Sequence, residues 1–156
     1  MTQLPTFPFT EVKRMQRWTN YSATIPEREI PVYCTPDVMG TLDANAPPKL
    51  RRHGDAIRAI LDYCMSGQRP LRVLGSRWSF SRIIEPGEVA LDPGNLDVVL
   101  KVPPNWVNKE YRDARPGTTP VFAQGGARVA RLNRRLGESG LALQTSGAGD
   151  GCVDRF

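Results

Sequence analysis

The amino-acid sequence predicts an α+β domain with small mixed sheets and two main helices. Two segments show the helical spacing of apolar residues, and short apolar segments typical of strands stand before, between and after them. Glycine and proline each occur 14 times among 156 residues, which favours many turns and short elements. Helices that alternate with small groups of strands are typical of an α+β or α/β domain with mixed sheets. The length accommodates one domain with a hydrophobic core.

The beginning of the chain shows few signs of regular structure. Residues 1–17 are predicted to form a loose N-terminal arm, and residues 18–156 the domain itself. A short strand is predicted near Ile30–Tyr33, where aromatic and β-branched residues gather. Residues 35–50 are rich in turn-forming residues and prolines, which predict a loop.

The first helix is predicted at Asp55–Ser66. The Asp55 carboxylate can accept a backbone N–H bond at the start of this helix. Gly67 is suited to the left-handed conformation that often ends a helix. One apolar face is predicted from the i, i+3, i+4, i+7 spacing. It consists of Ile57, Ile60, Leu61 and Cys64.

The second helix is predicted at Arg128–Glu138, with Gly140 just after its end. Its apolar face consists of Val129, Leu132 and Leu136. Residues 103–119 contain several prolines and a glycine, and we expect a long loop there. Five further short strands are predicted, with Pro93-Gly94 as a turn between the second and the third. They are Leu71–Leu74, Glu88–Asp92, Asp97–Val102, Pro120–Ala123 and Leu141–Gln144.

Charge, cysteine content and hydropathy argue against several classes of function. The formal net charge is +5, but the arginines are spread along the chain without a long basic run, so we do not expect nucleic-acid binding. Three widely spaced cysteines and one histidine lack the spacing of a zinc site, so no metal is expected. No signal peptide and no apolar run long enough to span a membrane stand out, so a soluble, cytoplasmic protein is expected.

The most informative segment is a polar loop that follows the predicted strand Leu71–Leu74. Gly75 lets backbone N–H groups approach a ligand without a Cβ in the way. Successive N–H groups in such a turn form an anion-binding nest. Serines at 76, 79 and 81 add hydroxyl donors, and Arg77 adds positive charge. The loop is suited to a pyrophosphate, although the spacing by itself also fits an ordinary turn.

A second loop of the same kind follows the last predicted strand, at residues 145–151. Between the two loops lie a predicted strand that ends in the acidic Asp92 and a Gly125-Gly126 pair before the second helix. Two loops rich in glycine and serine, each at the end of a strand, can clamp one ligand between them.

These segments together resemble a known family. LRVLGSRWSFS, VALD and QGGARVARLNRRLGESGLALQTSGAGDG are similar to the FAD-binding (PCMH-type) domain of the vanillyl-alcohol oxidase superfamily. The similarity is greatest to its sugar and aldonolactone oxidase branch, which includes alditol, gulonolactone and arabinonolactone oxidases. The resemblance covers roughly residues 18–151. It implies two α+β subdomains with FAD between them, of which this chain holds the first and the entry to the second.

The resemblance also implies the residues that contact FAD, while it names no catalytic residue in this chain. The first loop would surround the pyrophosphate, and the second would lie near the pyrophosphate or the flavin ring. The implied cofactor-binding residues are Val73, Leu74, Gly75, Ser76, Arg77, Trp78, Ser79, Ser146, Gly147, Ala148, Gly149, Asp150 and Gly151.

Two features depart from the family pattern. Many relatives carry a histidine in the first loop that bonds covalently to the flavin, whereas this chain has Trp78, so we expect non-covalent FAD. His53 precedes the loop and is no substitute. Relatives also continue well beyond the second loop into the rest of the FAD site and a substrate domain, whereas this chain ends at Phe156. A truncated product that is inactive alone is therefore expected.

The leading hypothesis is a domain of an FAD-dependent oxidoreductase that acts on CH–OH groups. In the complete enzyme, a hydride would pass from a sugar, polyol or lactone to the flavin, and the protein would orient the cofactor. The alternative is a non-catalytic remnant or binding module with the same fold that does not hold FAD. A nucleic-acid-binding protein is a third hypothesis, supported only by the arginines.

Overall fold

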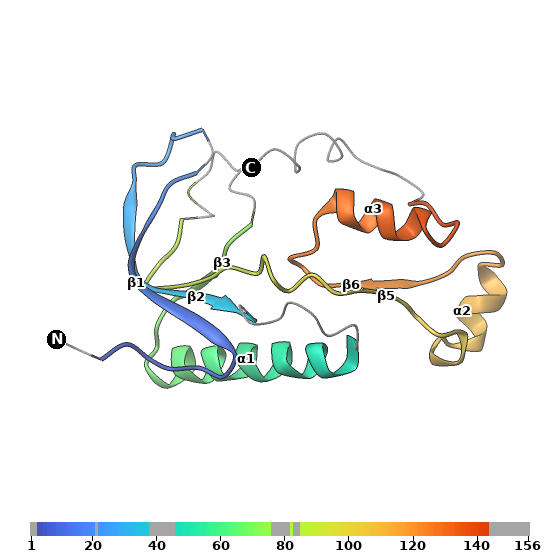
Figure 1. The fold of residues 1–156 in the computed structure, drawn as a ribbon, viewed down its shortest axis with the longest axis horizontal. Coiled ribbons are helices and arrows are strands. Elements are labelled where there is room, and N and C mark those ends of the chain that lie inside the picture. The colour runs from blue at the N-terminus through green and yellow to red at the C-terminus, as the bar shows by residue number, and fades with distance from the viewer. Residues whose placement is uncertain (1–2, 21, 38–45, 76–81, 83–84, 144–156) are drawn as a thin grey trace. The chain divides into compact units, whose positions relative to one another are not determined.

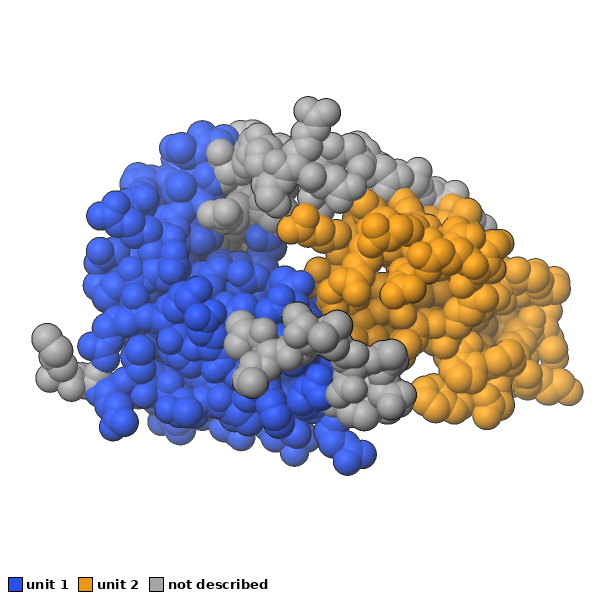
Figure 2. All heavy atoms as spheres, viewed as in Figure 1, with its two compact units in different colours: residues 1–96 blue, residues 97–156 orange. Residues whose placement is uncertain are grey.

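The computed structural model describes residues 3–20, 22–37, 46–75, 82 and 85–143. The chain divides into two compact units, unit 1 at Met1–Leu96 and unit 2 at Asp97–Phe156 (Figure 2). Strands and helices occur in both units, and each unit has its own small sheet. The predicted α+β class with small mixed sheets is therefore confirmed.

Unit 1 is built on a four-stranded sheet with the order β1-β2-β4-β3 (Figure 1). β2 (Arg28–Pro36), β4 (Val89–Leu91) and β3 (Leu71–Val73) run parallel to one another, with Val32 and Leu71 both opposite Val89. β1 (Thr10–Trp18) pairs antiparallel with β2. The strands predicted near Ile30–Tyr33, at Leu71–Leu74 and at Glu88–Asp92 are confirmed, with somewhat different ends.

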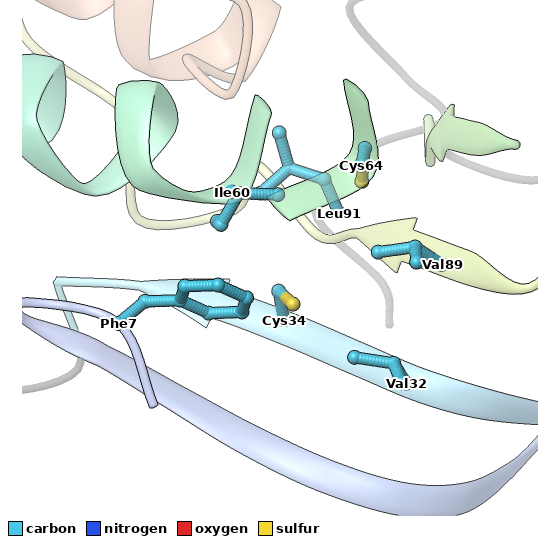
Figure 3. Close-up of a cluster of buried hydrophobic side chains, with 7 residues drawn as sticks. All are labelled: Phe7, Val32, Cys34, Ile60, Cys64, Val89 and Leu91. Carbon is cyan, nitrogen blue, oxygen red and sulfur yellow. The ribbon is translucent and has the colours of Figure 1, made fainter. Parts of the chain in front are cut away.

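One face of this sheet is covered by α1 (Ala46–Ser66) (Figure 1). Alternate residues of β2 and β4 point toward the helix, because successive side chains of a strand lie on opposite faces. The helix contributes Ile60 and Cys64 from the predicted apolar face, and the chain before β1 contributes Phe7 (Figure 3). The cluster consists of Phe7, Val32, Cys34, Ile60, Cys64, Val89 and Leu91.

A second buried cluster includes side chains that alternate with those under α1. Ala90 and Tyr33 belong to it, and both have the opposite parity in their strands from the residues that meet α1. Leu74, the first residue after β3, packs in the same cluster. Its buried members are Trp18, Ile25, Ile30, Leu74 and Ala90. β4 is therefore buried along its whole length, whereas the residues of β1 and β2 that point away from α1 are mostly exposed.

The predicted N-terminal arm is wrong for residues 10–17. These residues form most of β1, and its backbone pairs with β2 from Thr10↔Pro36 to Trp18↔Arg28. Phe7 is also buried, and its ring meets the Tyr63 ring edge-on at a centroid distance of 5.5 Å. The strand lacks an apolar alternation because it is an edge strand with charged residues, a common way to discourage edge-to-edge association.

The predicted boundaries of α1 need correction at both ends. The helix begins at Ala46, so the predicted loop at 35–50 is partly helix and Asp55 lies inside the helix instead of capping it. The prolines at positions 47 and 48 fall in the first turn, where proline needs no N–H partner. At the other end, the left-handed residue is Gln68, with φ of 50°, and not Gly67.

The described residues of unit 2 form a two-stranded antiparallel ribbon and three short helical segments. β5 (Val99–Lys101) and β6 (Val121–Ala123) confirm the strands predicted at Asp97–Val102 and Pro120–Ala123. The predicted loop 103–119 contains η2 (Pro104–Trp106) and α2 (Lys109–Ala114). Asn108 begins α2 because its side-chain oxygen accepts the Glu110 N–H at 2.8 Å, a local signal that the abundance of prolines obscured.

The second predicted helix is confirmed as α3 (Val129–Gly137). Gly140 follows it with φ of 66°, as predicted. Its N–H bonds to the Gly137 carbonyl at 3.0 Å, and the Leu141 N–H bonds to the Leu136 carbonyl at 2.9 Å, which is a Schellman ending. The strand predicted at Leu141–Gln144 is wrong for residues 141–143, which are not in a strand, and Gln144 lies outside the described residues.

Candidate functional site

The first predicted cofactor loop begins at the end of β3. Val73 is the last residue of β3 and is 55% exposed, Leu74 is buried, and Gly75 is exposed. The chain therefore passes from an exposed residue at the end of β3, through a buried residue, to the exposed glycine at which the loop begins. The other predicted cofactor-binding residues lie outside the described residues. They are Ser76, Arg77, Trp78, Ser79, Ser146, Gly147, Ala148, Gly149, Asp150 and Gly151.

Three chain segments leave the sheet at the same edge, because β2, β4 and β3 are parallel. Backbone hydrogen bonds continue the pairing just past the strand ends. The Leu74 N–H donates to the Leu91 carbonyl at 2.8 Å, and the Asp92 N–H donates to the Cys34 carbonyl at 2.9 Å. The carboxyl edge of the sheet thus brings together Leu74-Gly75, Asp92 and Asp37, which follow three neighbouring strands.

Two connections leave this edge from β2 and β3, the strands on either side of β4. From β2 the chain continues into α1, which covers one face of the sheet. From β3 the chain continues through Leu74, which packs in the cluster that holds Ala90 and Tyr33. β4 lies between these two strands. In open sheets with parallel strands, ligands bind outside the carboxyl ends of the strands, so this edge is the candidate site.

Asp92 follows the central strand β4 and is half-buried. One of its carboxylate oxygens accepts the Tyr33 hydroxyl at 2.7 Å, and the other accepts the Gly94 N–H at 2.9 Å. The predicted turn at Pro93-Gly94 is confirmed, since the Leu96 N–H donates to the Pro93 carbonyl at 2.7 Å. Asp92 therefore begins a tight turn and keeps a charged group at the carboxyl edge.

A buried ionisable pair lies at the end of β2, where no functional residue was predicted. Asp37 has a left-handed φ of 53°, and its side chain is 2% exposed. The His53 Nε2 lies 2.7 Å from an Asp37 carboxylate oxygen, and the His53 side chain is 1% exposed. The Arg52 Nε lies 3.6 Å from the other oxygen. Because a buried lone carboxylate is costly, these α1 side chains stabilise the turn that ends β2.

The sequence offered one signal for this pair. His53 is the single histidine of the chain, and it stands four residues before the predicted apolar face begins. His53 was not included in the predicted site because it lies far before the glycine loop in the sequence. The parallel pairing of β2 with β4 places its partner Asp37 at the same sheet edge as Asp92. Asn95 joins the two strand ends, because its side-chain amide donates to the Pro36 carbonyl at 3.1 Å.

Gly75 has no evident structural reason to be glycine within the described part of the chain. Its φ is not in the left-handed region. No described atom lies within 4 Å of a Cβ built on this residue. Packing and backbone conformation therefore leave the position open, and a bare backbone is available to an approaching group.

The buried cysteines contribute to packing and carry no reactive thiolate. Burial raises the pKa of the Cys34 thiol from its ordinary value of 9.0 to about 12, and the neighbouring Cys64 adds to the shift. Burial also raises the pKa of Cys64, against the effect of Arg69 and together with that of Glu88. Thiols are nucleophilic and bind metals as thiolates, so both side chains behave as small apolar groups. Over the described ranges, no group of three or more metal-ligating side chains occurs.

The comparisons with known proteins leave the chain without an assigned relative. No family model, no curated protein and no solved structure matches it. The candidate site is therefore defined by the fold and by the residues at the carboxyl edge of the sheet, without support from a relative. Within the part of the chain that the structure describes, no helix has both the length and the apolar character needed to cross a membrane.

Proposed function

We propose that this chain is an FAD-binding domain of the vanillyl-alcohol oxidase type, in an oxidoreductase that acts on CH–OH groups. One observation carries the proposal: Gly75, the first residue of the glycine loop, lies just past the carboxyl ends of three neighbouring parallel strands. Nucleotide cofactors bind at such edges. The resemblance of the loop sequences to the sugar and aldonolactone oxidase branch supports the choice of FAD.

The pyrophosphate of FAD is the part that this edge suits best. The N–H groups of Leu74 and Asp92 still pair with the neighbouring strands, but successive N–H groups further along a glycine turn can form an anion-binding nest, and a glycine permits close approach. Gly75 supplies an exposed backbone with open space around it. By resemblance, Ser76, Arg77, Trp78 and Ser79 would complete the phosphate contacts. A tryptophan at position 78 forms no covalent bond to flavin, so the cofactor would be held non-covalently.

The cofactor would supply the redox chemistry, since flavin accepts the hydride that leaves the substrate carbon. The residues of this chain would bind and orient the nucleotide half of FAD. The substrate class proposed from the resemblance is a sugar alcohol, a sugar or an aldonolactone.

A titration tests this function. FAD, ADP and riboflavin are each added to the purified chain up to about 1 mM, a range that reveals even weak sites. Binding is followed by flavin fluorescence and, for ADP, by calorimetry. We expect FAD and ADP to bind and to compete, and riboflavin to bind much more weakly because it lacks the phosphates. Absence of binding by FAD and ADP, or equal binding of riboflavin and FAD, would overturn the proposal and favour a module that does not hold FAD.

A substitution locates the site. Gly75→Ala is expected to weaken FAD binding roughly ten- to hundredfold, the effect of losing about one charge-assisted hydrogen bond. Its thermal unfolding should match that of the wild type, since the added methyl group meets no described atom. The matched control is Gly125→Ala, at another exposed glycine with open space and without a left-handed φ. An equal loss of binding in both variants would argue against a site at Gly75.

A further inference from the structure

Asp92 differs from the other shielded carboxylates of the chain in how its charge is balanced. Among the described residues, four carboxylates are buried or half-buried, and three of them have a basic partner. Asp37 pairs with His53 and Arg52, and the other two pairs are Glu85 with Arg28 and Asp97 with Arg131. Within the described part of the chain, the donors to Asp92 are the Tyr33 hydroxyl and the Gly94 N–H, and both are neutral.

A carboxylate with two neutral donors keeps further acceptor capacity. Its two oxygens offer about four lone-pair positions, of which these two hydrogen bonds occupy two. A half-buried anion without a counter-ion is costly unless further donors satisfy it. The ligand that completes such a group must bring donors of its own, as either hydroxyl groups or a cation. Among the described residues, no group of three or more histidine, cysteine or acidic side chains is placed to hold a metal ion, so Asp92 is a poor metal site.

The position of Asp92 favours hydroxyl groups of a ligand as its further hydrogen-bond donors. Asp92 follows the central strand, directly beside Leu74 and the start of the glycine loop, because Val73 is opposite Leu91 in the register. A negative charge at this place repels phosphate from its immediate surroundings. It attracts the sugar hydroxyls that adjoin the phosphates in a nucleotide, a division of roles known from dinucleotide-binding sheets.

We propose that Asp92 binds a vicinal diol of the bound nucleotide, with Tyr33 holding the carboxylate in position. This inference rests on the proposed FAD function. FAD offers two such groups, the ribose of its adenosine half and the ribityl chain of its flavin half. Both share the same chemistry, so the experiment separates them.

The test compares FAD affinity in the wild type, in Asp92→Asn and in the control Asp62→Asn. Asp62 is an exposed carboxylate on α1, so the control changes net charge equally without touching the sheet edge. Asp92→Asn is expected to weaken FAD binding roughly ten- to hundredfold, since hydrogen bonds to a charged group are stronger than those to a neutral one. Asp62→Asn is expected to bind FAD like the wild type. Unchanged binding in Asp92→Asn, with FAD still bound by the wild type, overturns the inference and leaves the FAD function intact.

Ligand analogues keep the test decisive if Asp92→Asn folds poorly. On the wild-type chain, ADP is compared with 2′-deoxy-ADP, and riboflavin with lumiflavin, which lacks the ribityl chain. A loss of affinity with 2′-deoxy-ADP assigns the ribose to Asp92, and a loss with lumiflavin assigns the ribityl chain. Equal affinities within both pairs overturn the inference. A wild-type chain that binds none of FAD, ADP and riboflavin overturns the proposed function and this inference with it.

Discussion

Single side chains in unit 1 show how burial changes their chemistry. Asp37 is tolerated in a left-handed, buried position because His53 and Arg52 lie against its carboxylate. Cys34, two strand positions from Val32 on the same face, lies in the apolar core and keeps its proton. The same environment that demands a partner for a carboxylate stabilises the neutral form of a thiol.

The raised pKa of Cys34 predicts a loss of stability at alkaline pH. The thiol ionises near pH 9.0 in the unfolded chain but only near pH 12 in the folded one. Its contribution is therefore fully present below pH 9 and is lost as the pH rises toward 12. The free energy of unfolding should fall more steeply in the wild type than in Cys34→Ala between about pH 8 and about pH 10.5, by up to about 1.4 kcal/mol per pH unit.

Urea denaturation at several pH values measures this difference. Cys34→Ala is expected to be less stable at every pH because it leaves a cavity, so the slopes and not the absolute values are compared. Side chains other than Cys34 are the same in both proteins, so their contributions to the slopes cancel in the comparison. Parallel slopes would show that the Cys34 thiol ionises in the folded chain as readily as in the unfolded one.

At the scale of elements, the two longer helices end in the same way but with different residues. After α3, Gly140 takes the left-handed conformation. After α1, Gln68 takes it, with its N–H on the Met65 carbonyl at 3.2 Å and the Arg69 N–H on the Cys64 carbonyl at 2.8 Å. The Arg69 guanidinium lies 4.1 Å from the Tyr63 ring centroid and donates to the Tyr63 carbonyl, which holds the chain after the helix.

The strained end of α1 offers a simple test. Gln68→Gly should stabilise unit 1 by about 1 kcal/mol, because glycine adopts a left-handed φ without the Cβ clash. The control Met65→Gly, at an exposed residue within the helix, should destabilise it by about the same amount through lost helix propensity. Chemical denaturation of the three proteins gives the comparison. Destabilisation by both glycines would mean that Gln68 is not left-handed in solution.

Local signals explain which elements could be predicted. α3 was found because three apolar residues at helical spacing and Gly140 all lie within one short segment. β1 was not predicted because its exposed face carries charged residues. It is held by pairing with β2, which is a separate segment of the chain. In the candidate site, Gly75 was predicted from its local pattern. The Asp37–His53 pair was not, because 16 residues separate its members and α1 brings them together.

At the scale of the whole molecule, the two units differ in the size of their buried core. Unit 1 has two clusters of buried apolar side chains on its sheet. Among the described residues of unit 2, Val98 and Leu136 are the buried hydrophobic side chains. A two-stranded ribbon has little stability by itself. Large apolar side chains such as Trp106 and Phe122 are exposed in unit 2. The burial of apolar surface therefore contributes less free energy to the stability of unit 2 than to that of unit 1.

Hydrogen exchange should reveal this difference. Backbone amides of β2 and β4 are expected to exchange slowly, at rates set by global unfolding, because both strands are inner strands of the sheet and contribute side chains to the buried clusters. Amides of β5 and β6 are expected to exchange at least about tenfold faster, through local opening. Exchange measured by NMR or by mass spectrometry on peptides gives both rates. Equal protection of the two sheets would show that unit 2 unfolds only together with unit 1.

The sequence by itself determined the α+β class, most of the strands and the greater part of both main helices. These features depend on residues that are close together in the sequence. The spacing of their apolar side chains and the capping residues determine where helices and strands begin and end. Only the tertiary structure decided that β4 lies between β2 and β3, so that Asp92 stands between Asp37 and Gly75 at one edge. Strand order is set by hydrogen bonds and side-chain packing between segments far apart in the chain, and no local pattern encodes it.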